Sequence, residues 1–97
     1  MDRQYYVYIL GNRLNTVLYT GVTGGLCKRV REHKQEIVPG FTKKYHIRSL
    51  LYYELYTDPV SAIEREKQIK NWNRKKKNTL ILKINPHLED LYSTLCK

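Results

Sequence analysis

Short apolar runs that alternate with period two predict three β-strands in this chain. Residues 5–10 read YYVYIL, residues 16–22 read TVLYTGV, and the turn residues between them predict a β-hairpin. A third run, SLLYYELY over residues 49–56, predicts another strand. Alternation puts Tyr8 and Tyr19 each on one face of its own strand. The register that decides whether the two tyrosines share a face cannot be read from the sequence.

The segment after the hairpin predicts a helix with chargeable residues on its inward side. Two glycines end the second strand, and the spacing that follows indicates a helix over residues 26–34. Positions 26, 29, 30 and 33 fall at intervals of three and four, and they carry Leu, Arg, Val and His. We therefore expect Arg29 and His33 to face the interior of the fold.

A second helix is predicted to begin at Pro59 and to run to about residue 70. Thr57 or Asp58 is a suitable N-cap, and proline is favoured at the first helical position. The expected apolar stripe of this helix consists of Ala62, Ile63 and Ile69. Glu66 completes the stripe, so a carboxylate is also expected to point inward.

A third helix is predicted between a cap at Asn73 and a stop at residues 85–86, which read Asn-Pro. Its expected inward residues are Leu80, Ile81 and Ile84. Residues 87–92 are expected to add a short helix. Together these elements predict one α/β domain of the α+β kind over residues 1–97, with an antiparallel sheet flanked by helices.

Composition narrows the class of partner. The chain has 18 Lys and Arg against 9 Asp and Glu, a net charge of +9, which favours an anionic partner such as nucleic acid or an acidic membrane surface. No apolar run approaches the ~20 residues needed to cross a bilayer, and the start MDRQ does not resemble a signal peptide. We therefore expect a soluble cytoplasmic protein in which Cys27 and Cys96 are free thiols.

The inward charges allow two interpretations. An unpaired buried guanidinium or carboxylate is unfavourable by several kcal/mol, so a partner is required. In the first interpretation, Arg29 and Glu66 form an internal salt bridge. In the second, Glu66 holds a divalent cation and Arg29 faces a phosphate in a cleft, with tyrosine hydroxyls and His33 nearby, which are the parts of a metal-assisted phosphodiester hydrolysis.

The spacing of these residues resembles that of the GIY-YIG nuclease superfamily. The chain has YVY ending at Tyr8, YTG beginning at Tyr19, Arg29 ten positions later, His33 four beyond that, and Glu66 within AIEREKQIK. It departs from the namesake, because Tyr-Val stands in place of Gly-Ile in the first triplet and YTG replaces YIG. The motifs GFTKKY and YYE extend the likeness to the small stand-alone bacterial members, over nearly the whole chain.

This resemblance implies a metal-dependent endonuclease of the structure-specific kind linked to DNA repair or recombination, built on a central three-stranded antiparallel sheet. It makes Tyr19 or Tyr8 the activator of the attacking water, Arg29 the phosphate stabiliser, His33 a helper in proton transfer and Glu66 the ligand of a single Mg²⁺ or Mn²⁺. The implied substrate is nucleic acid, with DNA favoured over RNA. The alternative is a non-catalytic nucleic-acid-binding module, or one that depends on a protein partner for substrate choice.

Further basic and polar residues are candidates for contact with the nucleic acid. They are Lys43, Lys44, Lys70, Arg74, Lys77 and Asn78. Lysine and arginine that track a phosphate backbone supply affinity without sequence information. The alternative without nucleic-acid contact is equally open, because a run of charges is usually a solvated helix face and GFTKKY is equally typical of an ordinary exposed loop.

Overall fold

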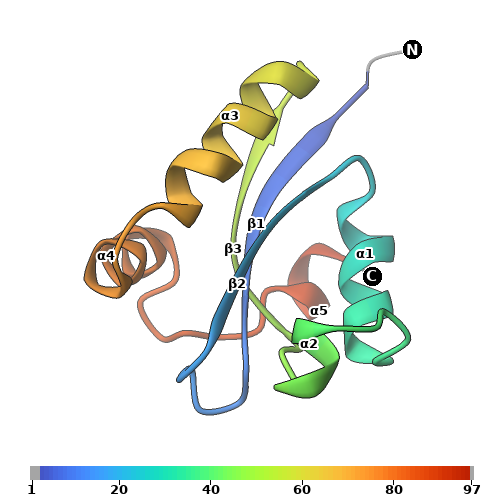
Figure 1. Cartoon of the computed structure of the whole chain (residues 1–97), viewed down its shortest axis with the longest axis vertical. Helices are drawn as coiled ribbons and strands as arrows, with labels where there is room; N and C mark the ends of the chain where they lie inside the picture. Colours follow the sequence, from blue (N-terminus) through green and yellow to red (C-terminus); the bar gives the residue numbers. More distant parts are fainter. Residues whose placement is uncertain (1–2, 97) are drawn as a thin grey trace.

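A computed structural model describes residues 3–96 and contains a three-stranded antiparallel sheet at its centre (Figure 1). Strand β1 spans Tyr5–Gly11, β2 spans Leu18–Thr23 and β3 spans Ser49–Tyr56, and their order in the sheet is β2-β1-β3. The predicted three-stranded sheet is confirmed, and β1 is its middle strand.

The strand register settles which tyrosines share a face. Tyr8 lies opposite Gly21 and Leu10 lies opposite Tyr19 in the β1–β2 pair. Directly opposed residues of paired strands point to the same side of the sheet. Tyr8 and Tyr19 therefore occupy one face, diagonally across the two strands.

A β-bulge interrupts the pairing of β1 with β3. Ile9 pairs with Tyr52 while Leu10 pairs with Leu50, so Leu51 is the extra residue. The carbonyl of Leu51 accepts a hydrogen bond of 3.0 Å from Nδ2 of the buried Asn85. The asparagine that ends the last long helix thus satisfies a backbone group at the bulge.

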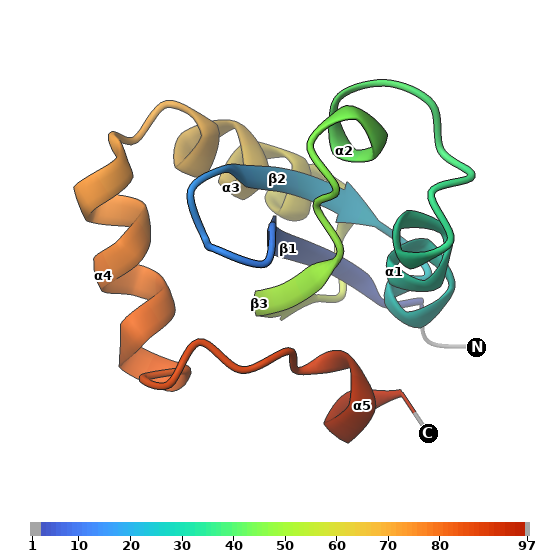
Figure 2. The same ribbon diagram turned by 90° about the horizontal axis from the view of Figure 1, so that it is seen from below.

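Within residues 3–96, five helices lie around the sheet and cover both of its faces (Figure 2). They are α1 (Leu26–Lys34), α2 (Phe41–Lys44), α3 (Pro59–Lys70), α4 (Arg74–Ile84) and α5 (Tyr92–Leu95). Capping follows the sequence signals, because Asp58 accepts from the backbone N–H of Ser61 at 2.7 Å and Asn73 accepts from that of Lys76 at 2.8 Å.

Two apolar clusters fill the two sides of the sheet. Val7 and Ile9 of β1 pack with Ala62 and Ile69 of α3 and with Ile81 of α4. On the opposite side, a second cluster joins β1 to α1 and to the end of the chain; it comprises Tyr8, Leu10, Leu26, Val30, Ile47 and Leu50, with Leu91 and Tyr92 against it. A tyrosine of this second cluster is thus also a candidate site residue.

Several sequence-based expectations about the helices are wrong in detail. Ile63 and Ile84 are exposed, because α3 and α4 pack on the sheet through Ala62, Ile69 and Ile81, with Leu80 partly buried against this cluster as expected. The short C-terminal helix occupies Tyr92–Leu95 rather than 87–92, and α2 forms where a loop was expected.

The cysteines also differ from expectation. Cys27 in the first turn of α1 and Cys96 after α5 form a disulfide, so neither is a free thiol. The bond joins positions 69 residues apart and ties the end of the chain to α1.

No helix among residues 3–96 is both long enough and apolar enough to span a membrane.

Candidate active site

Gly21 allows the Tyr8 ring to lie across β2. A Cβ atom added to Gly21 would come within 2.5 Å of both Cζ and Oη of Tyr8, which is far inside van der Waals contact. The tyrosine side chain therefore fills the space that any side chain at position 21 would need. Only 2% of Tyr8 is exposed, so its phenol is enclosed beneath the site.

Three rings from β1, β2 and α1 meet at this point. The ring centroid of His33 lies 5.7 Å from that of Tyr19 and 6.3 Å from that of Tyr8, and the two tyrosine rings are 6.3 Å apart. Tyr19 is partly exposed, whereas Tyr8 and His33 are buried. Of the two phenols, Tyr19 is therefore the one that solvent or a substrate can reach.

His33 is oriented by a residue of α2. Its Nδ1 lies 2.9 Å from Oγ1 of Thr42, which is itself buried. Its Nε2 is buried and has no hydrogen-bond partner among residues 3–96. In the tautomer whose Nδ1–H donates to Thr42, Nε2 carries a lone pair that can accept a proton.

The surroundings shift the pKa values of two of these rings. Burial raises the pKa of the Tyr8 phenol well above its ordinary 10.0; the neighbouring Tyr19 and the charge of Glu66 act in the same direction, and Arg29 opposes them. Burial lowers the pKa of His33, and the positive charge of Arg29 lowers it further. The Tyr8 phenol therefore keeps its proton near pH 7, and His33 is neutral there.

Arg29 does not face the interior as the sequence predicted. The buried face of α1 consists of Leu26, Val30 and His33, and the guanidinium lies at the flank of this face, where it avoids desolvation. Its Nε is 3.8 Å from Oε1 of Glu32. Arg29 remains close enough for its charge to act on both Tyr8 and His33.

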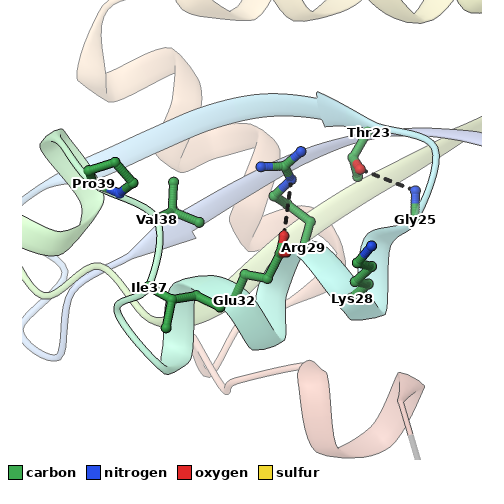
Figure 3. A pocket seen from close by; sticks show the side chains of 8 residues that line it. All are labelled: Thr23, Gly25, Lys28, Arg29, Glu32, Ile37, Val38 and Pro39. Atoms are coloured by element: carbon green, nitrogen blue, oxygen red, sulfur yellow. Dashed lines mark hydrogen bonds and ion pairs between the residues drawn. The ribbon is translucent and has the colours of Figure 1, made fainter.

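A pocket of about 430 Å³ opens beside Arg29 (Figure 3). Lys28, Arg29 and Glu32 of α1 form one wall, the end of β2 contributes Thr23, and residues 37–39 lie across from them. The guanidinium therefore borders a solvent-filled space that is large enough for a phosphate group.

Glu66 lies on α3, which packs against both β1 and β2. Its side chain is 14% exposed, and its Oε1 is 3.3 Å from Nζ of Lys70, one turn later on the same helix. Among the described residues Glu66 forms no ion pair with Arg29, so the internal salt bridge between them is not present. The Glu66 charge nevertheless acts on Tyr8.

The Glu66 carboxylate can hold a single hard cation only if substrate or water supplies the remaining ligands. Residues 3–96 contain no cluster of three or more His, Cys, Asp or Glu side chains that could hold a metal. Mg²⁺ commonly binds through one or two carboxylates and retains several waters or takes phosphate oxygens. Glu66, half-buried near a phenol, is compatible with such a site and not with an all-protein cage.

A buried ionic network fixes α3 one residue before Glu66. The carboxylate of Glu54 accepts hydrogen bonds from Nε and Nη2 of Arg65, each at 3.0 Å, and from the hydroxyl of Tyr56 at 2.7 Å; the hydroxyl of Tyr52 also donates to it. Burial alone would raise the pKa of Glu54, but the hydrogen bonds from Arg65, Tyr52 and Tyr56 outweigh it and lower that pKa. The YYE segment therefore holds α3 against β3.

The predicted nucleic-acid contacts fall into three pairs with different surroundings. Lys43 and Lys44 are exposed on α2, next to the Thr42 that orients His33. Arg74 instead donates to the backbone carbonyls of Asn15 and Thr16 in the hairpin loop, the latter at 2.9 Å. Its Nε also donates to Oδ1 of Asn78 at 3.0 Å, so Arg74 and Asn78 brace the hairpin.

Lys70 pairs with Glu66, and Lys77 is half-buried in α4. Contact of all six residues with nucleic acid stays a prediction. The sequence analysis did not identify Thr42, whose buried hydroxyl orients His33. The position of Thr42 within the GFTKKY motif was the signal that could have pointed to it.

Comparison with known proteins identifies the family of this chain. A family model described as the GIY-YIG catalytic domain matches residues 4–79, so the chain belongs to this nuclease family. It is similar to a UPF0213 protein of Haloquadratum walsbyi, 34% identical over 80 residues that cover 82% of this chain and 89% of that one. A UPF0213 protein of Staphylococcus saprophyticus is 33% identical over 81 residues, covering 84% and 96% of the two chains.

The fold has a counterpart among solved structures. The solution NMR structure of a UPF0213 protein from Bacillus halodurans matches with a TM-score of 0.58, covering 97% of this chain and 98% of that chain at 23% identity. The α+β fold with its antiparallel sheet is thus shared.

Proposed function

We propose that this protein is an endonuclease that hydrolyses a phosphodiester bond of nucleic acid with one Mg²⁺ or Mn²⁺ held at Glu66. The observation that carries the proposal is the meeting of Tyr8, Tyr19 and His33 on one sheet face, within reach of the charges of Arg29 and Glu66. We further propose that the substrate is DNA, that the protein acts in repair or recombination, and that it is located in the cytoplasm.

Each side chain has a distinct task in this proposal. Tyr19, partly exposed, holds the attacking water at Oη, because Tyr8 is enclosed and burial raises the pKa of its phenol, which therefore keeps its proton. As Tyr19 takes a proton from the water, its own hydroxyl proton passes to Nε2 of His33, which has no hydrogen-bond partner among residues 3–96. Arg29 offsets the negative charge that accumulates on the phosphoryl oxygens. Glu66 would hold the divalent ion, which when bound would supply Lewis-acid polarisation of the phosphoryl group and stabilise the charge on the leaving oxygen.

The test is cleavage of branched, nicked and single-stranded DNA and RNA by purified protein with Mg²⁺ or Mn²⁺. We expect Glu66→Gln and Arg29→Ala to abolish cleavage, because each removes a charge that the reaction requires. Glu64→Gln and Arg31→Ala are matched controls on the exposed sides of the same helices and should cleave normally. Cleavage that survives in Glu66→Gln at the wild-type rate would overturn the proposal.

A binding module without activity of its own, or one that needs a partner, is the second candidate. The Lys70–Glu66 ion pair favours it, because an ammonium at 3.3 Å competes with a metal for the carboxylate. Calorimetric titration with Mn²⁺ distinguishes the two. Binding that is lost in Glu66→Gln and strengthened in Lys70→Ala supports the enzyme, whereas no binding in any variant, with oligonucleotide present, supports the module.

A further inference from the structure

A row of aromatic rings leads from the candidate site to the surface. The Phe41 ring centroid lies 6.4 Å from that of Tyr19 and 4.9 Å from that of Tyr45. Phe41 is 47% exposed and Tyr45 is 40% exposed. We name the exposed pair Phe41 and Tyr45 the α2 platform. Two adjacent large aromatic side chains open to solvent are unusual, and their flat faces suit a planar ligand.

The α2 platform is held firmly at the site. Thr42 points inward to Nδ1 of His33 at 2.9 Å, and its carbonyl accepts from the N–H of Ile47 at 2.9 Å. Gly40 precedes the helix with φ of 107°, a backbone conformation that favours glycine. Because the inward side of α2 is fixed in this way, Phe41 and Tyr45, four residues apart, share its outward side.

The charge around the α2 platform selects the kind of ligand. Lys43 and Lys44 are exposed beside it, and Nζ of Lys44 lies 5.3 Å from the Tyr45 ring centroid. The nearby acid Glu36 is already paired with His46 and Arg48. A ligand that offers both a negative charge and an aromatic face fits this surface, and a nucleotide has both.

We propose, on the basis of the nuclease function above, that an unpaired nucleobase next to the scissile phosphate stacks on the α2 platform. A paired base has its faces covered by its neighbours in the duplex, so only an unpaired one can use the rings. The proposal thus assigns a substrate with at least one unpaired nucleotide. A fully paired duplex gains nothing from Phe41 and Tyr45.

Binding without divalent metal tests this apart from cleavage. We expect the double variant Phe41→Leu with Tyr45→Leu to bind a labelled single-stranded 12-mer about 5- to 150-fold more weakly, the range that stacking of one base provides. Its affinity for a matched, fully paired duplex without a loop should change less than about twofold. Phe41→Trp with Tyr45→Phe should restore binding, and Ile84→Ala, exposed on α4, should have no effect.

A second measurement needs no variant. Phe41 is the sole phenylalanine of the chain, so phenylalanine labelled with ¹³C gives a single NMR probe at the α2 platform. We expect its ring signals to move upfield on titration with the single-stranded 12-mer. The proposal is overturned by a Phe41 signal that does not move, by equal losses for single strand and duplex, or by wild type that fails to bind the 12-mer at low salt.

The two proposals fail separately. Cleavage with an unmoved Phe41 signal removes the α2 platform and leaves the nuclease. If a base stacks on Phe41 but no substrate is cleaved, the α2 platform remains as the binding site of a non-catalytic module.

Discussion

Replacing Gly21 with alanine tests the packing at the centre of the site. The new Cβ would lie 2.5 Å from Cζ and Oη of Tyr8, whereas unstrained contacts of this kind need more than 3.4 Å. Tyr8 is 2% exposed and lies among the residues of the cluster beneath α1, so its ring cannot swing freely into solvent. A shift of about 1 Å in the ring or in β2 is therefore required.

Overpacking of this size destabilises a protein by about 1–3 kcal/mol. In a domain of this length that corresponds to a fall of roughly 4–20 °C in Tm. We also expect any cleavage activity to drop by at least tenfold, because Tyr8 supports the rings of Tyr19 and His33.

Urea denaturation, thermal melting and a cleavage assay measure these effects. Gly24→Ala is the matched control, because a Cβ there meets only the carbonyl of Gln4 at an ordinary 3.9 Å. Tyr8→Leu in the Gly21→Ala background should recover part of the lost stability, which a double-mutant cycle detects. Gly21→Ala with the stability of the control would refute this account of how Tyr8 is packed.

Three further predictions concern the surrounding structure. Glu54→Gln should lower the free energy of unfolding by about 2 kcal/mol in urea, since it weakens charged hydrogen bonds from Arg65. Burial lowers the pKa of His33, so below pH 6.5 the unfolded chain binds a proton there that the folded chain does not. The free energy of unfolding should therefore have its full value above pH 6.5 and decrease on acidification. In thermal melts between pH 6.5 and 5, Tm should fall less steeply with pH in His33→Gln than in wild type. Reducing Cys27–Cys96 should lower stability by about 4 kcal/mol in the chain-entropy model, and identical urea midpoints with and without reductant would contradict this.

Local signals predicted most of the fold correctly. The strand over residues 49–56 and the helix over residues 26–34 have the predicted bounds, because alternation, glycine breaks and a clear helical spacing all act over a few residues. The Asp58 and Asn73 caps are likewise set by neighbours in sequence. That Tyr8 and Tyr19 share a face could be learned only from the hairpin register, which depends on contacts between strands.

Where the sequence misled, distant contacts decide the outcome. Ile63 has the spacing of a core residue, but α3 packs through Ala62 and Ile69 and leaves it exposed. Arg29 lies at a spacing typical of the buried face and yet stays at its flank, since a buried guanidinium would lose its hydration. The one-turn helix α2 is too short for periodicity to reveal it. The bond between Cys27 and Cys96 depends on how the C-terminal segment packs against α1.

Because β1 is the middle strand, the two parts of the site are expected to differ in how fast their backbone amides exchange with solvent. Amides of β1 are sheltered by strands on both sides, so we expect the backbone around Tyr8 to exchange with deuterated water only when the whole molecule unfolds. The single turn of α2 is anchored through Thr42, but its backbone amides belong to no sheet and to only one helical turn, so we expect them to exchange through brief local openings. A bound oligonucleotide would then slow exchange over residues 41–45 and leave that of β1 unchanged. The protein thus presents its substrate with one wall that opens only on global unfolding and one whose backbone the substrate itself protects.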